Sequence, residues 1–571
     1  MAIRRIFAVT GVLVPGVVVA IVALGGSALA ARSNDARNCD RASGDRAITA
    51  CTRAIKSGHF KGHALAVLHV NLAVEQGRKG RLDRAINEYD RAIKLDAKLA
   101  VAYNGRGNIF RARGDNDRAV ADYTRALELD PKLAVAHNSR GNAYRAKGDY
   151  QRAIADYGQA IRLNAKYANA YYGRANAHRF LRDNDRAIAD YTQAIRYSGK
   201  DAPAYNGRGL ARRAKGEIDG AIADYSQAIK LDPKFAIAYS NRGDAFRIKG
   251  DNDRAIADYE DAVRLDAGLA LAYSGRGNAY RAKGDNDRAL ADFDRAIRLD
   301  PKLEVAHNNR GSMLLAKGDI DGAIAAYGEA IRLTPKLPFA YYNRGTAHLS
   351  KGDGSRAIAD FDEAIRLAPN FVDALSARCV ANTFVSRGPQ ALADCNKALQ
   401  LIPNQAQTLE NRGAAYLIVN QLDRAVADFD AALRLDPKLA GALFLRGAIR
   451  LKQGDTAGGN ADIAAAKAIE PDIAGKLLPS GASATASRPG PATAPPRAPA
   501  TASAPAAAAP APGVAPQPTA PATHCAMAET HWKSAEEINT LAVYQDHLAR
   551  FPDCAFATLA TVRIQALRNR R

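Results

Sequence analysis

Arginine recurs along this chain at intervals of 34 residues. One series contains Arg111, Arg145, Arg179, Arg213, Arg247 and Arg281. A guanidinium group pairs with a carboxylate or a phosphate through two parallel hydrogen bonds, so this series could bind an anionic ligand. The alternative is a solvated face that only aids solubility. The series then ends, because the next equivalent positions hold Leu315, Leu349, Thr383, Leu417 and Leu451.

A second arginine series has the same period and runs from Arg106 to Arg446. Most copies also carry a matching acid, such as Asp122, Asp156 or Asp462. The similar numbers of opposite charges favour an ion-pair ladder between adjoining repeats over ligand binding. Partly buried pairs of this kind set the register of neighbouring elements more than they add net stability.

No residue pattern in the chain predicts catalysis. The chain has no phosphate-binding GxxxxGK[ST] loop, no HExxH helix, no GxSxG turn and no CxxC pair with histidine partners. His524 and Cys525 are adjacent, but Cys525 is more simply explained as half of a disulfide. The repeated GDNDRA segments lack the glycine and the closing glutamate of a calcium loop. We therefore expect no enzyme activity, no cofactor and no metal site.

Small residues at fixed intervals indicate the elements that position these arginines. Glycines spaced by 34 residues or its multiples include Gly107, Gly141 and Gly447, with Ala73, Ala175 and Cys379 in the remaining slots. A second small residue follows twelve positions later, and an alanine seven after that, with a mostly aromatic slot between them. Small side chains let two helices approach closely. Gly–Asp pairs such as Gly114–Asp115 end one helix and cap the next.

This pattern resembles the tetratricopeptide repeat over residues 66–473, including the proline that closes eight copies. The resemblance implies an all-α fold: an α-solenoid, or superhelix, of twelve tandem helical hairpins. Each hairpin must stack on its neighbours because it cannot bury its apolar face alone. Residues 31–65 resemble a shortened extra copy whose first helix is about one turn short.

The resemblance also implies a concave groove lined by the first helix of each hairpin. The groove would expose polar side chains besides the first arginine series: Asn104, Asn108, Asn138, Asn142, Tyr172, Asn176, Asn206, Asp244, Asn278 and Asn308. A carboxamide both donates and accepts hydrogen bonds, so it can pair with the backbone of an extended peptide.

The first thirty residues resemble a signal peptide. Arg4 and Arg5 precede an apolar run over residues 6–24, and small residues favour cleavage after Ala30. The alternative is an uncleaved inner-membrane anchor formed by residues 6–24. Either interpretation predicts a protein that is periplasmic or otherwise exported.

Six cysteines fall into three local pairs, which in an exported chain indicates disulfides. The pairs are Cys39 with Cys51, Cys379 with Cys395, and Cys525 with Cys554. Residues 479–523 are rich in proline and alanine and predict a disordered linker. Residues 524–571 predict a small helical module closed by the third disulfide.

The chain carries 80 Lys and Arg against 59 Asp and Glu, a net charge of +21. Our first hypothesis is a non-catalytic exported scaffold that binds an extended, acidic peptide segment of a cell-envelope protein in its groove. The alternative is an envelope protein whose basic face holds anionic polysaccharide or lipid head groups. Export makes nucleic acid a weaker third hypothesis, and nothing points to a small-molecule substrate.

Overall fold

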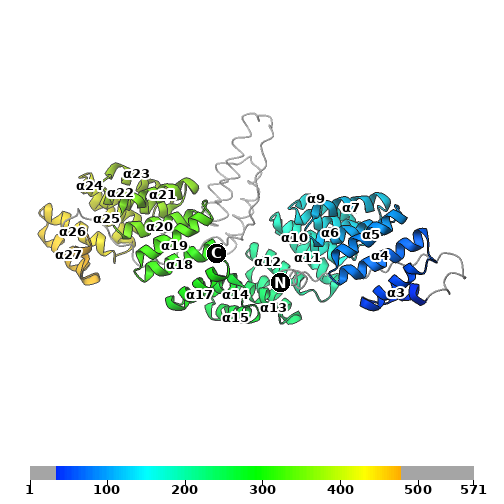
Figure 1. Cartoon of the computed structure of the whole chain (residues 1–571). Helices are drawn as coiled ribbons and strands as arrows, with labels where there is room; N and C mark the ends of the chain where they lie inside the picture. The colour runs from blue at the N-terminus through cyan, green and yellow to red at the C-terminus, as the bar shows by residue number, and fades with distance from the viewer. Residues whose placement is uncertain (1–33, 478–571) are drawn as a thin grey trace, which may run out of the picture. The chain divides into compact units, whose positions relative to one another are not determined.

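The structure is a computed structural model that describes residues 34–477. The predicted signal segment, the linker and the C-terminal module with Cys525 and Cys554 lie outside the described residues. All regular secondary structure within residues 34–477 is helical, which confirms the predicted all-α class (Figure 1).

The helices alternate as first and second members of hairpins. The first helices are α2 (Asn34–Arg41), α4 (Gly62–Arg78), α6 (Ala100–Ala112), α8 (Ala134–Ala146), α10 (Ala168–Phe180), α12 (Ala202–Ala214), α14 (Ala236–Ile248), α16 (Ala270–Ala282), α18 (Glu304–Ala316), α20 (Pro338–Ser350), α22 (Val372–Phe384), α24 (Ala406–Ile418) and α26 (Ala440–Lys452). The second helices are α3 (Gly44–Lys56), α5 (Leu82–Leu95), α7 (Asn116–Leu129), α9 (Tyr150–Leu163), α11 (Asn184–Ser198), α13 (Ile218–Leu231), α15 (Asn252–Leu265), α17 (Asn286–Leu299), α19 (Ile320–Leu333), α21 (Gly354–Leu367), α23 (Gly388–Leu401), α25 (Leu422–Leu435) and α27 (Thr456–Ile469). The short helix α28 (Ile473–Leu477) follows.

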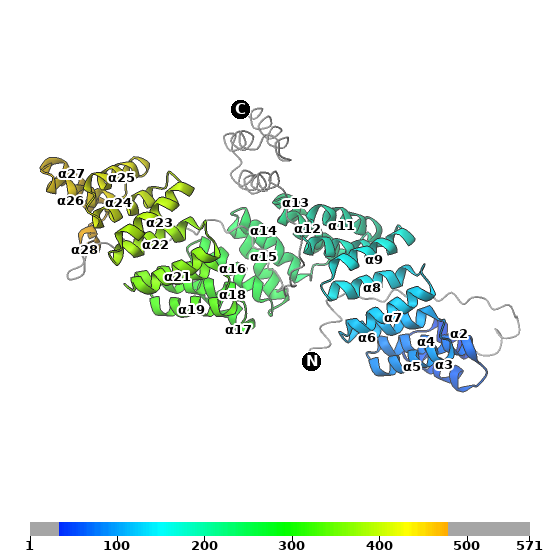
Figure 2. The same ribbon diagram turned by 90° about the horizontal axis from the view of Figure 1, so that it is seen from above.

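Each hairpin packs only on its neighbours along the stack (Figure 2). Every first helix contacts the second helix of its own hairpin and the second helix of the hairpin before it. Successive first helices also contact one another, whereas the second helices show no comparable run of contacts. The first helices therefore form a continuous surface through the array.

Small residues allow the close helix contacts inside each hairpin. A Cβ atom added to Gly107 would lie 2.8 Å from Cε1 of Tyr123, so a larger residue here would require the ring to shift. Ala73 and Ala175 are the largest residues that face a buried tyrosine from this position in other hairpins. Ala119 and Tyr123 on the facing helix are fully buried. The aromatic ring thus fills the space that the glycine leaves open.

The turn inside most hairpins combines a left-handed glycine with an aspartate cap. Gly114 has a φ of 83°, and the Asp115 side chain accepts a hydrogen bond from the backbone N–H of Arg118. Arg182, Ser386 and Asn420 stand where other copies have this glycine and keep its positive φ.

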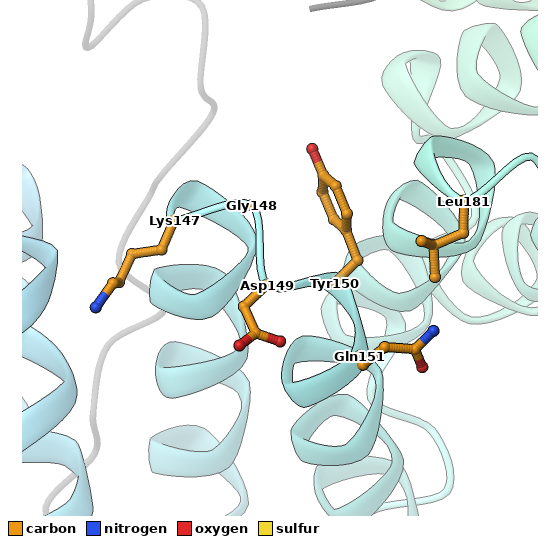
Figure 3. A pocket seen from close by; sticks show the side chains of 6 residues that line it. All are labelled: Lys147, Gly148, Asp149, Tyr150, Gln151 and Leu181. Atoms are coloured by element: carbon orange, nitrogen blue, oxygen red, sulfur yellow. The ribbon is translucent and has the colours of Figure 1, made fainter. Parts of the chain in front are cut away.

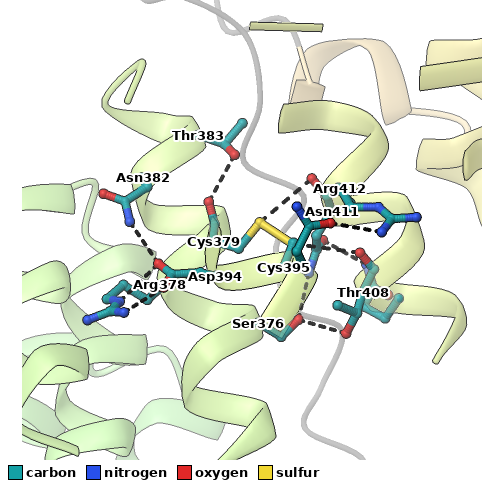
Figure 4. Close-up of a disulfide and its surroundings, with 12 residues drawn as sticks. Ser376, Arg378, Cys379, Asn382, Thr383, Asp394, Cys395, Thr408, Asn411 and Arg412 are labelled. Atoms are coloured by element: carbon teal, nitrogen blue, oxygen red, sulfur yellow. Dashed lines mark hydrogen bonds and ion pairs between the residues drawn. A yellow bond between two sulfur atoms is a disulfide. The ribbon is translucent and has the colours of Figure 1, made fainter. Parts of the chain in front are cut away.

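Two disulfides lie within the described residues and confirm two predicted pairings. Cys39 in α2 bonds to Cys51 in α3, and α2 is short, with 8 residues against 13 in α6. Cys379 in α22 bonds to Cys395 in α23 (Figure 4). Both sulfurs of this pair are fully buried and replace the glycine–aromatic contact of other hairpins.

Candidate functional site

The second arginine series forms an ion-pair ladder, but within hairpins rather than mainly between them. Arg106 donates from Nε to Asp122 Oδ2 at 2.8 Å and from Nη2 to Asp122 Oδ1 at 2.7 Å. These two residues lie on facing helices of one hairpin. The remaining nitrogen reaches back to the preceding hairpin, where Arg106 Nη1 lies 2.6 Å from Asp90 Oδ1.

The same bidentate Arg–Asp pair occurs in ten hairpins, from Arg106–Asp122 to Arg446–Asp462. Arg310 is the exception: Ala326 replaces its own-hairpin acid, so it pairs with Asp294 of the preceding hairpin. Hydrogen bonds to Asp122 raise the pKa of Arg106, as expected for a tightly held cation. This series is therefore structural, and its charges are already compensated.

The predicted groove residues share one side of the first helices. In α6, Asn104, Asn108 and Arg111 are spaced four and three residues apart, which places them on one helix face. The equivalent residues are Asn138, Asn142 and Arg145 in α8; Tyr172, Asn176 and Arg179 in α10; Asn206 and Arg213 in α12; Asp244 and Arg247 in α14; Asn278 and Arg281 in α16; and Asn308 in α18. We call this side of the first helices the inner face.

The inner-face arginines differ in whether an acid compensates them. Arg213 Nη1 lies 2.8 Å from Asp244 Oδ2, and Arg247 Nη2 lies 4.0 Å from the other oxygen of the same carboxylate. Among residues 34–477, no carboxylate oxygen lies within 4.0 Å of the nitrogens of Arg111, Arg145, Arg179 or Arg281. These four side chains are half-buried.

Three of the uncompensated arginines stand on consecutive first helices: Arg111, Arg145 and Arg179. Their Nε atoms are buried without a hydrogen-bond partner. The cationic part of the inner face is thus concentrated on α6, α8 and α10, and Asp244 interrupts the series farther along.

Several inner-face amides are engaged with buried tyrosines. The phenol of Tyr123 donates to Asn108 Oδ1 at 2.8 Å, and Tyr157 and Tyr191 donate to Asn142 and Asn176 in the same way. This contact was not predicted from the sequence, although the tyrosine follows the asparagine by 15 residues in each of these copies. Burial raises the pKa of Tyr123 to about 12, and the nearby Arg111 guanidinium group acts in the opposite direction.

The remaining inner-face amides are buried or already hydrogen-bonded, so they are poorly placed to pair with the backbone of a bound peptide. Asn104 is only 4% exposed, and its Oδ1, like that of Asn138, is buried without a partner. Asn206 and Asn308 accept hydrogen bonds from Asn241 and Asn343 of the next first helix. Asn278 donates to the carbonyl of Ser274 and accepts from Asn309. The arginines are consequently the main available chemistry of the inner face.

Residues 34–477 contain no cluster of three or more His, Cys, Asp or Glu side chains that could hold a metal ion. In the same part of the chain, no helix combines the length and apolar character needed to cross a bilayer.

Family models match the repeats directly. A model described as TPR repeat matches residues 78–110, 107–145, 141–179, 209–247, 243–280 and 311–352. Two models described as tetratricopeptide repeat match residues 270–303 and 338–371, and residues 168–201 and 406–439. The chain belongs to the tetratricopeptide repeat family. Proteins of this family are generally protein-interaction scaffolds and are generally non-catalytic.

Solved structures with the same repeat resemble parts of the array. The Cut9–Hcn1 hetero-tetramer of APC/C matches at 16% identity and a TM-score of 0.42, covering 74% of this chain and 96% of that one. YrrB, described as a TPR protein with an unusual peptide-binding site, matches at 24% identity and a TM-score of 0.29, covering 32% and 95%. A tetratricopeptide repeat protein from Parabacteroides merdae matches at 23% identity and a TM-score of 0.37, covering 44% and 98%. No curated protein matches the chain.

Proposed function

We propose that this protein is an exported, non-catalytic scaffold whose inner face binds an extended acidic segment of another cell-envelope protein. The observation that carries the proposal is the run of three uncompensated arginines on α6, α8 and α10. A half-buried guanidinium group without a carboxylate partner gains more from an incoming anion than a fully solvated one, because less water competes for its hydrogen bonds.

An extended chain fits this arrangement better than a compact anion does. The three arginines lie on successive first helices, so one bound segment would have to pass all three hairpins to pair with each of them. An acidic polypeptide can place carboxylates along such a path.

The test is peptide binding by two matched variants of the full chain. Arg111→Gln/Arg145→Gln/Arg179→Gln removes three charges from the inner face. Arg118→Gln/Arg152→Gln/Arg186→Gln removes three charges from the same hairpins, where exposed arginines pair with the aspartate caps of the second helices. We expect the first variant to bind a glutamate-rich peptide about 100-fold more weakly, at about 1 kcal/mol for each guanidinium, and the second to bind almost unchanged.

The same assay distinguishes the alternative ligand. An anionic polysaccharide or a vesicle of anionic lipid responds to total charge, so both variants would weaken its binding equally and moderate salt would abolish it. Equal weakening of peptide binding by both variants would contradict the proposal. Saturable binding that only the inner-face variant loses supports it.

Export is part of the proposal and has support from two observations. Disulfides persist in oxidising compartments, and two of them cross-link the described residues. The first thirty residues have the charge and apolar pattern of a signal segment. The mass of the mature protein tests this: cleavage after Ala30 yields a chain that begins at Ala31, and recovery of the intact chain from the cytoplasm would contradict export.

A further inference from the structure

An open pocket recurs where the turn of one hairpin meets the end of the next first helix. One such pocket has a volume of about 360 Å³ and lies between α8, α9 and α10 (Figure 3). It is lined by Lys147, Gly148, Asp149, Tyr150, Gln151 and Leu181. Three repeats farther along, an equivalent pocket of about 470 Å³ is lined by Lys249, Gly250, Asp251, Asn252, Asp253 and Lys283. We call these the α8–α10 pocket and the α14–α16 pocket.

The α14–α16 pocket is polar because an ion pair crosses it. The Lys283 amine donates to the Asp253 carboxylate of the preceding hairpin. Equivalent pairs, which we call rungs, join Lys215 to Asp185 and Lys317 to Asp287 at 2.6 and 2.8 Å. In the α8–α10 pocket, Gln151 and Leu181 occupy the two rung positions, so no ion pair can form there.

Aromatic side chains take the place of the missing rung. Tyr150, at the start of α9, stacks on Phe180 at the end of α10, with ring centroids 5.1 Å apart and an interplanar angle of 8°. Phe180 is 38% exposed and Leu181 is 41% exposed. Tyr150 and Leu181 therefore line the α8–α10 pocket, and Phe180 supports the Tyr150 ring from beside it.

At two other rung positions an apolar residue replaces the lysine, and both of those gaps are filled. Val385 and Val419 replace the lysine there, and Gly354 and Gly388 stand where α9 has Tyr150. A Cβ atom on Gly354 would lie 2.7 Å from Val385 Cγ1, and one on Gly388 would lie 2.4 Å from Val419 Cγ1. The valines thus pack directly onto backbone. Tyr150 has the opposite effect and leaves a pocket beside its ring.

The α8–α10 pocket adjoins the cationic part of the inner face. The guanidinium carbon of Arg179 lies 4.9 Å from the centroid of the Phe180 ring. Arg179 is also the last of the three uncompensated inner-face arginines. A chain that pairs with Arg179 would therefore pass beside the Phe180 ring, on which Tyr150 stacks.

We propose that the α8–α10 pocket binds one aromatic side chain of the acidic segment, next to the acidic residues that pair with Arg111, Arg145 and Arg179. This inference rests on the proposed function and adds a specificity element to it. An incoming ring extends the Tyr150–Phe180 stack, and a neighbouring carboxylate compensates Arg179. Charge selects the ligand class, and the pocket selects among acidic segments.

The test compares two fluorescent glutamate-rich peptides that differ only by one tryptophan replaced with alanine. We expect the full chain to bind the tryptophan peptide about tenfold more tightly. The variant Tyr150→Asn/Gln151→Asp/Leu181→Lys restores the residues of the α14–α16 pocket, so it should fold and re-form a rung. It should bind both peptides with the affinity that the wild type has for the alanine peptide.

A matched control alters the equivalent polar pocket. Asp253→Gln/Lys283→Leu removes a rung without adding aromatic residues, and the tryptophan preference should persist. A wild type that binds both peptides equally overturns this inference and leaves the proposed function intact. A preference that survives in the restored-rung variant also overturns it. Failure of either peptide to bind at all would overturn both proposals.

Discussion

The first helices of the two ends of the array use the same positions for different purposes. On α6, α8 and α10, one inner-face position holds Arg111, Arg145 and Arg179, which lack acidic partners. On α20 that position holds Leu349, which is buried in the core of the stack. Asn104 in α6 corresponds to Glu410 in α24, whose carboxylate accepts from Gln407 Nε2 at 2.7 Å and packs against Gly441 at the start of the next first helix. One region keeps arginines without an acidic partner at the first of these positions, and the other fills both positions with side chains that pack against its own neighbours.

The buried aromatic residues follow the same division. Tyr123, Tyr157 and Tyr191 donate to inner-face amides, whereas Phe361 and Phe429 have no hydroxyl group and face Thr346 and Ala414 at the equivalent positions. A fixed backbone repeat therefore permits a polar inner face and an apolar one. The difference lies in side chains that the repeat pattern itself does not constrain.

The largest expected effect comes from exchanging the two side chains at this position. Leu349→Arg places an unpaired guanidinium group in a buried site, so it should lower the free energy of unfolding by about 4 kcal/mol. Arg179→Leu removes a half-buried, uncompensated charge and should change stability by less than about 1 kcal/mol. Urea unfolding of both variants measures the two changes in the free energy of unfolding. Similar destabilisation by both would show that the two positions are alike after all.

Removal of the Cys379–Cys395 disulfide should have the next largest effect. The bond closes a separation of 16 residues, so Cys379→Ala/Cys395→Ala should lower the free energy of unfolding by about 3 kcal/mol. Binding of a glutamate-rich peptide should stay unchanged, because the bond lies far along the array from α6, α8 and α10. Thermal unfolding and peptide titration of one sample check both expectations. Loss of binding would contradict the division between the two regions.

Glu410 should make the stability of the α24 region depend on pH. Burial raises the pKa of this carboxyl group from 4.5 to about 7. The folded state then holds the proton more tightly than the unfolded chain does, so this group's contribution falls as pH rises from about 4.5 to about 7. The loss is on the order of 3 kcal/mol.

The variant Glu410→Gln keeps an oxygen that can accept from the Gln407 side chain but cannot ionise. The difference in unfolding free energy between wild type and this variant should therefore change across that window and level off above it. Comparing the two chains removes the contributions of His178 and His348, whose pKa values burial lowers. A constant difference would mean that Glu410 is solvated like an exposed acid.

The smallest expected effect concerns two tyrosines that differ in their partners. Tyr157→Phe leaves the Oδ1 of Asn142 without its donor and should cost about 1 kcal/mol. The phenol of Tyr225 is buried without a partner because Leu210 replaces the amide, so Tyr225→Phe should be neutral or slightly stabilising. Thermal unfolding of the two variants gives the comparison. Equal losses would mean that the amide contact contributes nothing.

Much of the fold could be predicted from local spacing. Gly107 and Ala119 indicate close helix contacts, and Gly114–Asp115 indicates a turn and a cap, because such requirements act within one hairpin. The pairing of Cys379 with Cys395 was predicted from their closeness in the sequence, and the structure confirms it. Arg106 and Asp122 were also recognised as partners, but the sequence alone did not reveal that they face each other within one hairpin.

The candidate site could be predicted only in outline, because its details depend on which neighbouring hairpins meet. Compensation of Arg213 by Asp244 joins two different first helices, and nothing in the 34-residue period signals it. The α8–α10 pocket did leave a trace in the sequence. Asp and Lys recur 30 residues apart in most copies, and Gln151 with Leu181 breaks that pattern. The position where the repeated Asp–Lys pair is interrupted was therefore more informative about the pocket than the pair itself.

The rungs and the bidentate Arg–Asp pairs have a consequence for how the length of the array can change. Each one ties a hairpin to itself or to the hairpin before it, and none extends farther. A whole hairpin, such as residues 270–303, could therefore be deleted or duplicated. The hairpins on either side of the change would then meet through the same kinds of contact as before. The length of the array can therefore change in units of one hairpin. Such a change would alter the distance between the cationic end and the leucine-bearing end without altering the residues of either end.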